Sequence, residues 1–361
     1  MDVLFQIPVL GYVLQFLGYL VDAIFTTNLP AQTLQLATPI ALGALCGVLN
    51  ERSGVVNIGI EGMMLTSAFV GFMAAMVVSE AMPGAEAGFF GFTPALVVGV
   101  LAAIAAGMLV SLLHAWLSIT VRADQIISGT VINIIALGLT GYLNRLIKPG
   151  GSAGTLDPLR PPQELLDLPL VGWVVKMFFT SGPITTSVIF FVIALQVMLF
   201  RSRWGLRTRA VGEHPRAADT VGINVIGVRY RNVVLGGIFA GLAGAWLTLE
   251  FNASFQNGMT ANRGFIALAA VIFGRWTPIG AFGGALLFMV WEALGIAIRS
   301  NPPPGDLGVF LSGIQTTYPS LYSNFFGALP YLLTLIVLAG VVGRSIPPAA
   351  DGQPYVKEGA T

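Results

Sequence analysis

Long apolar runs separated by short polar breaks organise the chain. A helix needs roughly 20 apolar residues to cross the roughly 30 Å hydrocarbon core of a bilayer. None of the runs alternates apolar and polar residues with a period of two, as membrane-spanning strands do. The pattern therefore predicts an all-α polytopic membrane protein, a bundle of about eight to ten transmembrane helices. Runs of this kind lie at residues 4–25, 32–49, 58–79, 94–118, 127–147, 183–200, 231–251, 278–299 and 323–343.

Two apolar segments depart from the regular span. The first run, 4–25, contains Gln15 and Asp22, so it either crosses the membrane or lies along its interface. A short run at 264–274 is too brief to cross alone and predicts at least one broken or re-entrant element. We expect an extra N-terminal helix in residues 1–30, a transmembrane domain in 31–343 and a polar, frayed tail in 344–361.

Composition excludes several classes of protein. Apolar residues make up 55% of the 361 positions and charged residues only 10%, whereas soluble domains carry about 25% charged residues. The net charge is +1 with no basic block, so electrostatic binding of nucleic acid has no basis. With a single cysteine, Cys46, and two histidines, the chain cannot form an intrachain disulfide or a multi-cysteine metal site.

Lysine and arginine positions predict the orientation, because cytoplasmic loops carry an excess of both. Placing the arginine-rich segment 201–231 in the cytoplasm puts 12 of the 18 basic residues inside and predicts that both termini are cytoplasmic. This arrangement requires residues 264–274 to enter the membrane part-way and pair with 278–299. The 12 are Arg52, Arg122, Arg201, Arg203, Arg207, Arg209, Arg216, Arg229, Arg231, Arg275, Arg344 and Lys357.

Polar, glycine-containing stretches interrupt the apolar pattern once in each half of the chain, at residues 51–62 and 257–265. Paired interruptions of this kind are the best sequence pointer to a transporter's midplane site, where unwound backbone and helix N-termini face a solute. We expect Glu61 in the first turn of the following span, where the helix dipole favours a carboxylate. The alternative for 51–62 is a capped cytoplasmic turn.

Small residues and loops complete the pattern. Glycine and alanine recur four residues apart, which lets helices pack closely or slide past one another in lipid. Residues 148–182 and 300–322 are rich in proline and glycine and predict long outer loops. The small residues concerned are Gly43, Gly47, Gly236, Gly237, Ala240, Gly241, Gly244, Ala245, Gly280 and Gly284.

The arginine-rich segment contains a short predicted helix. Pro215 stands in its first turn, and Gly222 is placed to end it about two turns later. Such a helix, with Ala217, Ala218 and Ile223 presented outward, would fit a groove on a partner. The chain has no phosphate-binding loop, because none of its lysines follows a glycine. Any ATP hydrolysis must therefore come from another polypeptide.

Four stretches resemble a known family. The segment 211–218 with Gly222 and Ile223 is similar to the coupling-loop motif of ABC-importer permeases, in the group for branched-chain amino acids, ribose and nucleosides. Residues 51–62, 263–274 and 348–350 match the same group, so the resemblance covers about residues 32–350. The Asn-Ile-Gly-Ile-Glu-Gly string at 57–62 is most like simple-sugar and nucleoside permeases. The run 4–25 and the loop 148–182 are departures from the family pattern.

The resemblance implies a multi-pass permease of a bacterial inner membrane. It would pair with a second permease chain, identical or homologous, with cytoplasmic ATP-binding subunits and with an external substrate-binding lipoprotein. ATP would be bound by the partner, and this chain would hold no cofactor. The implied coupling residues are Gly212, Glu213, Arg216, Ala217, Ala218, Gly222 and Ile223, and the candidate path residues are Asn57, Gly59, Glu61, Asn262 and Phe265.

A second hypothesis belongs to another class of transporter. A stand-alone, ion-coupled secondary transporter would use intramembrane carboxylates as relays, and Glu61, Glu250 and Glu292 are the candidates. This hypothesis predicts dependence on an ion gradient and indifference to an ATPase. The sequence contains no nucleophile–base motif, so a soluble-type enzyme site is not expected.

Overall fold

The computed structural model describes residues 8–25, 29–84, 88, 91–147, 152, 154–168, 170–340 and 345–357. Throughout these ranges the regular structure is helical and no strand occurs. Seven of the helices described are long and apolar enough to cross a membrane, and the chain is a multi-pass membrane protein. Lys148 and Arg344 of the charge analysis, residues 1–7 and residues 358–361 lie outside the described ranges.

Within the described residues, all nine apolar runs are helical over most of their length; residues 4–7 and 341–343 of the first and last runs lie outside those residues. The ends are set by local chemistry: Thr93 accepts a hydrogen bond from the backbone N–H of Leu96, and Pro94 occupies the first helical position. Two helices continue into π-helical turns, at Trp116–Thr120 and Trp246–Phe251. The apolar helices are α1 (Pro8–Phe25), α2 (Leu29–Glu51), α3 (Ile60–Ala81), α4 (Pro94–Ala115), α5 (Gln125–Ile147), α8 (Pro183–Arg201), α11 (Val225–Ala245), α12 (Arg263–Phe273), α13 (Pro278–Ser300) and α15 (Pro319–Gly340).

The chain divides into two compact units. The first comprises Met1–Ala37, Arg160–Ser181 and Leu286–Gly343, and the second comprises Thr38–Leu159, Gly182–Ala285 and Arg344–Thr361. The sequence-based division at residues 30 and 343 stays a prediction.

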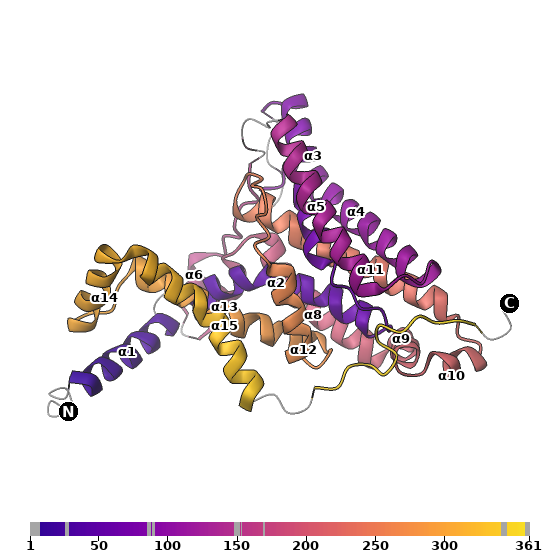
Figure 1. The fold of residues 1–361 in the computed structure, drawn as a ribbon. Helices are drawn as coiled ribbons and strands as arrows, with labels where there is room; N and C mark the ends of the chain where they lie inside the picture. Colours follow the sequence, from indigo (N-terminus) through magenta and orange to yellow (C-terminus); the bar gives the residue numbers. More distant parts are fainter. Residues whose placement is uncertain are drawn as a thin grey trace. The chain divides into compact units, whose positions relative to one another are not determined.

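The second unit is built around α3, α4, α5 and α11, which lie side by side (Figure 1). Glycines bring the backbones of α4 and α11 into contact: a Cβ at Gly107 would lie 2.8 Å from the Gly241 nitrogen, and one at Gly237 would lie 2.8 Å from the Met108 Cα. Because apolar burial drives little association in lipid, such close approach stabilises the bundle through packing. The predicted small-residue ladder thus acts as a packing surface.

The first unit joins α1 to α14 (Asp306–Thr317). The rings of Tyr12 and Phe310 stack with centroids 6.4 Å apart. The Tyr19 hydroxyl donates to the carbonyl of Asn301 at 3.0 Å, and the Gln15 side chain accepts from the Leu307 N–H at 3.2 Å. These contacts hold the extra N-terminal helix against the segment after α13.

Three expectations for the connecting segments were incomplete. The outer segment 148–182 contains two helices, α6 (Gln163–Leu166) and α7 (Val171–Phe179), and 300–322 contains all of α14 and the start of α15. A helix α9 (Arg203–Glu213) precedes the predicted short helix. Residues 345–357 of the tail are bound to the second unit rather than frayed. These segments are short or polar, so hydropathy gave little sign of them.

Candidate functional site

The first helix break is the interruption at residues 51–62, which connects α2 to α3 inside the bundle. The side chain of Asn57 is fully buried, and its carbonyl oxygen accepts from the N–H of Gly59 at 3.0 Å. Asn133 of α5 donates to the Ile58 carbonyl at 3.0 Å and accepts from the Gly62 N–H at 2.7 Å. These two amides satisfy backbone groups that an unwound segment would leave unpaired in a dry environment.

His114 and Gln125 hold the same break from α4 and α5. Gln125 accepts from the Val56 N–H at 2.7 Å, and a His114 ring nitrogen lies 3.0 Å from the Val56 carbonyl oxygen. The other ring nitrogen of His114 lies 3.1 Å from the Ser128 hydroxyl. His114 is thus a buried structural residue with both nitrogens satisfied.

Glu61 joins the first break to the second. It lies in the first turn of α3, as predicted, and accepts from the N–H groups of Asn262 at 2.9 Å and Gly264 at 2.6 Å. Its carboxylate therefore caps α12, where free N–H groups and the helix dipole favour negative charge. A Cβ at Gly264 would lie 2.5 Å from the Glu61 Cα, so glycine is needed for this approach.

The helices that follow the two breaks, α3 and α12, have their first turns beside the middle of α2 rather than beyond its end. A Cβ on Gly43 would be 3.0 Å from the Ala267 Cβ and 3.4 Å from the Ile60 Cγ2. The helices α3 and α12 therefore begin beside Gly43, two turns before α2 ends at Glu51. This placement supports a broken, partly re-entrant element rather than a simple turn at the end of α2.

The five candidate path residues occupy different environments. Glu61 and Asn262 are in direct contact, and Asn57 is fully buried beside Gly59. Gly59 lies close to the backbone of Gly129, because a Cβ added to Gly59 would be 3.3 Å from the Gly129 Cα. Phe265, in the first turn of α12, is 42% exposed. Among these five, Phe265 therefore presents the largest accessible apolar side chain.

A second set of contacts, missed by sequence reasoning, lies where α2 ends. Arg52 donates to the carbonyls of Trp276 at 2.7 Å and Arg275 at 3.1 Å, and the Trp276 indole N–H donates to Glu51. Arg275 and Trp276 both have positive φ, so these bonds hold a strained turn between α12 and α13. Burial lowers the pKa of Arg52, and the nearby Glu213 opposes that shift. In the sequence, the one sign of this turn was the polar break Arg275-Trp276-Thr277 between two apolar runs.

The predicted short helix is confirmed as α10 (Pro215–Thr220). Pro215 is its first residue, and Gly222, with φ of +80°, follows its end. The N–H of Ile223 donates to the Ala218 carbonyl at 3.0 Å, which satisfies a group at the helix C-terminus. The proline start and glycine stop were therefore sufficient to place this element.

The residues of the coupling motif divide by exposure. Glu213, Arg216, Ala217 and Gly222 are exposed. Ala218 is 4% exposed and packs with Val211, Val225 and Val228, while the half-buried Ile223 packs against the same cluster. Ala218 and Ile223 therefore face the protein interior, contrary to the outward presentation expected of them.

Gly212 brings α9 against the first break. It is buried, and a Cβ there would collide with the carbonyl oxygen of Arg52. Since Arg52 also holds the turn at 275–276, α9 contacts a residue of the first break that is hydrogen-bonded to the turn after α12.

The comparisons with known proteins identify the family. A family model described as the permease component of branched-chain amino acid transport systems matches residues 29–342. The chain belongs to this permease family. No solved structure matches the permease significantly.

Named relatives cover nearly the whole permease. It is 40% identical to the guanosine ABC transporter permease protein NupQ of Bacillus subtilis (strain 168), across 90% of this chain and 95% of that protein. It is 37% identical to the nucleoside ABC transporter permease protein NupC of Lactococcus lactis, across 91% and 96%. A more distant relative, 27% identical across 70% and 66%, is the glucose ABC transporter permease protein TsgB13 of Haloferax volcanii. The permease is thus an ABC transporter membrane subunit.

The carboxylates of the competing hypothesis have structural partners. Glu250 accepts from the N–H groups of Ile184 at 2.7 Å and Thr185 at 3.0 Å, so it caps α8. Glu61 caps α12 in the same way. Glu292 lies half-buried in α13. Two of the three proposed relays are therefore occupied with backbone groups, which favours the ABC permease over ion-coupled transport.

Proposed function

We propose that this permease provides the membrane path for nucleosides, and for related simple sugars, in an ATP-driven ABC importer. The observation that carries the proposal is the 40% identity with a guanosine permease across nine-tenths of both chains. The glucose permease among its relatives extends the proposed class of solutes to simple sugars, because a nucleoside also contains a sugar ring. The exposed ring of Phe265 suits stacking against a base.

We further propose that a separate ATP-binding subunit docks on residues 201–230 and supplies the ATP site that this chain lacks. Glu213, Arg216, Ala217 and Gly222 form the accessible part of that surface, and Ala218 and Ile223 pack beneath it. Docking moves solute only if the subunit binds one conformation of the permease better than the other. Glu61, at the junction of α3 and α12, is where such a change would reach the path.

The remaining partners follow from the importer assignment. The arginine-rich segment faces the cytoplasm, which makes both termini cytoplasmic. A second permease chain completes the pathway, and an external binding lipoprotein delivers the solute. The membrane is the bacterial inner membrane.

Reconstitution in liposomes tests the proposal. Labelled guanosine and glucose uptake is measured with the permease alone, and with its companion permease and ATP-binding subunits, under ATP or an imposed proton gradient. We expect guanosine uptake only with the ATP-binding subunit and ATP. Gradient-driven uptake by this chain alone would establish the secondary transporter instead.

A further inference from the structure

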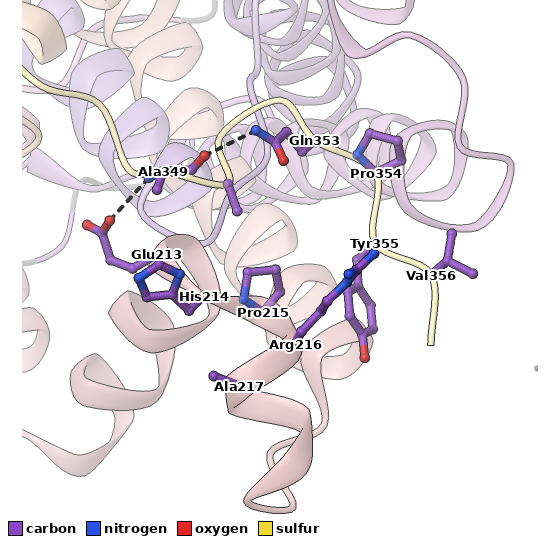
Figure 2. A pocket seen from close by; sticks show the side chains of 11 residues that line it. Glu213, His214, Pro215, Arg216, Ala217, Ala349, Gln353, Pro354, Tyr355 and Val356 are labelled. Atoms are coloured by element: carbon purple, nitrogen blue, oxygen red, sulfur yellow. Dashed lines mark hydrogen bonds between the residues drawn. The ribbon is translucent and has the colours of Figure 1, made fainter. Parts of the chain in front are cut away.

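The C-terminal segment 345–357 is bound along the arginine-rich region. The N–H of Ala350 donates to the Gly212 carbonyl at 2.9 Å. The N–H of Ala349 donates to the Glu213 carboxylate at 3.1 Å, as Figure 2 shows. Both acceptors lie at the end of α9, directly before α10. The tail is therefore fixed to the residues that lead into the coupling helix.

Further contacts hold the tail downstream. Arg229 of α11, only 1% exposed, donates to the Gln353 carbonyl at 2.8 Å. Tyr355 is 8% exposed and packs in the cluster that contains Ala218 and Val211. With backbone bonds at one end and a buried ring at the other, the tail has one preferred position, and the surface it forms is preorganised.

A cavity of about 500 Å³ lies between the tail and α10. One wall carries residues 213–217, and the other carries Ala349, Ala350 and residues 353–356, as Figure 2 shows. Prolines 215 and 354 and the half-exposed Val356 make much of the lining apolar. A cavity of this size accommodates several side chains.

The surroundings of the cavity indicate the chemistry of its partner. Arg216 lines the cavity and is exposed, and three further arginines are exposed earlier in the same arginine-rich segment, which favours an acidic partner surface. Apolar side chains are also exposed, with Val356 at 48% in the lining and Val221 at 74% directly after α10. Apolar side chains beside charged ones are typical of a protein–protein interface. The exposed arginines are Arg201, Arg203, Arg207 and Arg216.

We propose that α10 and tail residues 349–356 form one composite docking surface for the ATP-binding subunit, and that the cavity between them receives an apolar side chain of that subunit flanked by acidic residues. This inference rests on the proposed function and adds the tail to it. The docking surface is then continuous from Arg216 to Val356, and the tail sets the position of α10 before the subunit arrives.

Affinity measurements with the full permease in lipid nanodiscs test this inference. Val356→Asp charges the tail wall, Ala217→Asp charges the helix wall, and Ala349→Trp narrows the cavity without removing a backbone N–H. The matched control is Ile346→Asp, a 78% exposed tail residue that does not line the cavity. The probe is the purified ATP-binding subunit, and its Kd is measured by biolayer interferometry.

We expect each cavity variant to weaken binding about ten-fold or more, because a buried charge or an overfilled pocket excludes the partner's side chain. The control should stay within about two-fold of the unaltered permease. The combination of Val356→Asp and Ala217→Asp should weaken binding by less than the product of the single effects, since both line one cavity.

The outcomes separate the two proposals. If Ala217→Asp weakens binding while both tail variants bind like the unaltered protein, the composite surface is wrong and docking on α10 stands. If none of the variants changes the Kd, the proposed docking on residues 201–230 itself fails.

Discussion

Glu61 is the residue at which α3 and α12 meet. Its two carboxylate oxygens accept from two N–H groups of one helix start, so the charge is divided between two donors in a fixed geometry. The left-handed conformation of Asn262, with φ of +65°, aims those N–H groups at the carboxylate. A side chain so engaged holds the first turn of α3 against the start of α12, and its place on the solute path stays a prediction.

Replacing Glu61 by glutamine should destabilise the permease by about 1–3 kcal/mol. The amide keeps one acceptor, but its NH₂ group then faces a backbone N–H donor. Thermal unfolding in detergent measures the loss as a lower Tm. The matched control is Glu80→Gln at the exposed end of the same helix. Equal Tm values for the two variants would show that the cap contributes nothing.

Asp351 gives the tail a pH response. Burial and, to a smaller extent, repulsion from Glu51 raise the pKa of its carboxyl, the Gly352 N–H and Arg229 oppose them, and the net result is a pKa of about 8. Tyr355 is the other titratable group beside Arg229. A released tail would return Asp351 toward its ordinary pKa of 3.8. The bound tail therefore holds a proton that the released tail gives up.

Tail binding should consequently be strongest near pH 4, weaken as the pH rises to about 8, and change little above that value. A fluorine label on Val356→Cys, followed by NMR, measures the bound fraction at pH 5 and pH 8. The same label in the Asp351→Asn background provides the comparison and should give equal fractions at both pH values. A pH response that survives the substitution would assign the proton to another group.

At the scale of elements, backbone contact between α4 and α11 depends on glycine. Gly107→Val should prevent this packing, because a side chain there collides with the backbone of Gly237 and Gly241. Overpacking costs about 1–3 kcal/mol in proteins that can adjust, and more where the neighbour is backbone. Size-exclusion profiles from expressed membranes should show little folded protein. The control is Gly138→Val on α5, which meets nothing within 4 Å, and a monodisperse Gly107→Val peak would contradict the packing argument.

The sequence predicted those elements whose formation depends on residues close together in the chain. Runs such as 94–118 became helices because length and hydropathy suffice in a bilayer. The helix α10 was predictable because Pro215 and Gly222 mark its ends. The bound tail was not predictable, since its position depends on Arg229 and Glu213, which lie more than 100 residues away in the chain. For Glu61, sequence gave the helix turn but not its partner α12.

At the scale of the whole molecule, a chain of contacts connects the docking surface to the breaks. The end of α9 touches Arg52 through Gly212, Arg52 holds the turn after α12, and α12 begins at Glu61. The first link is a close backbone approach, and the other two are hydrogen bonds between a charged side chain and backbone groups. We therefore expect a displacement of α9 and α10 to move α12.

Gly212→Val should break this chain of contacts at its first link. The added side chain collides with the Arg52 carbonyl and forces α9 away from the break, while every exposed side chain of α10 is kept. We expect the ATP-binding subunit to bind and hydrolyse ATP, and nucleoside uptake to fall about ten-fold or more. Uptake and hydrolysis measured in the same proteoliposomes give the ratio that decides the question.

The matched control is Gly84→Asn, in the turn after α3 and outside the proposed docking surface. Gly84 has φ of +77° and nothing within 4 Å of an added Cβ, and asparagine tolerates that left-handed conformation. Uptake per ATP should therefore stay at the level of the unaltered permease. If Gly212→Val also keeps that ratio, α9 does not transmit movement through Arg52. If both uptake and hydrolysis disappear because the subunit no longer binds, the contact at Gly212 serves docking rather than transmission.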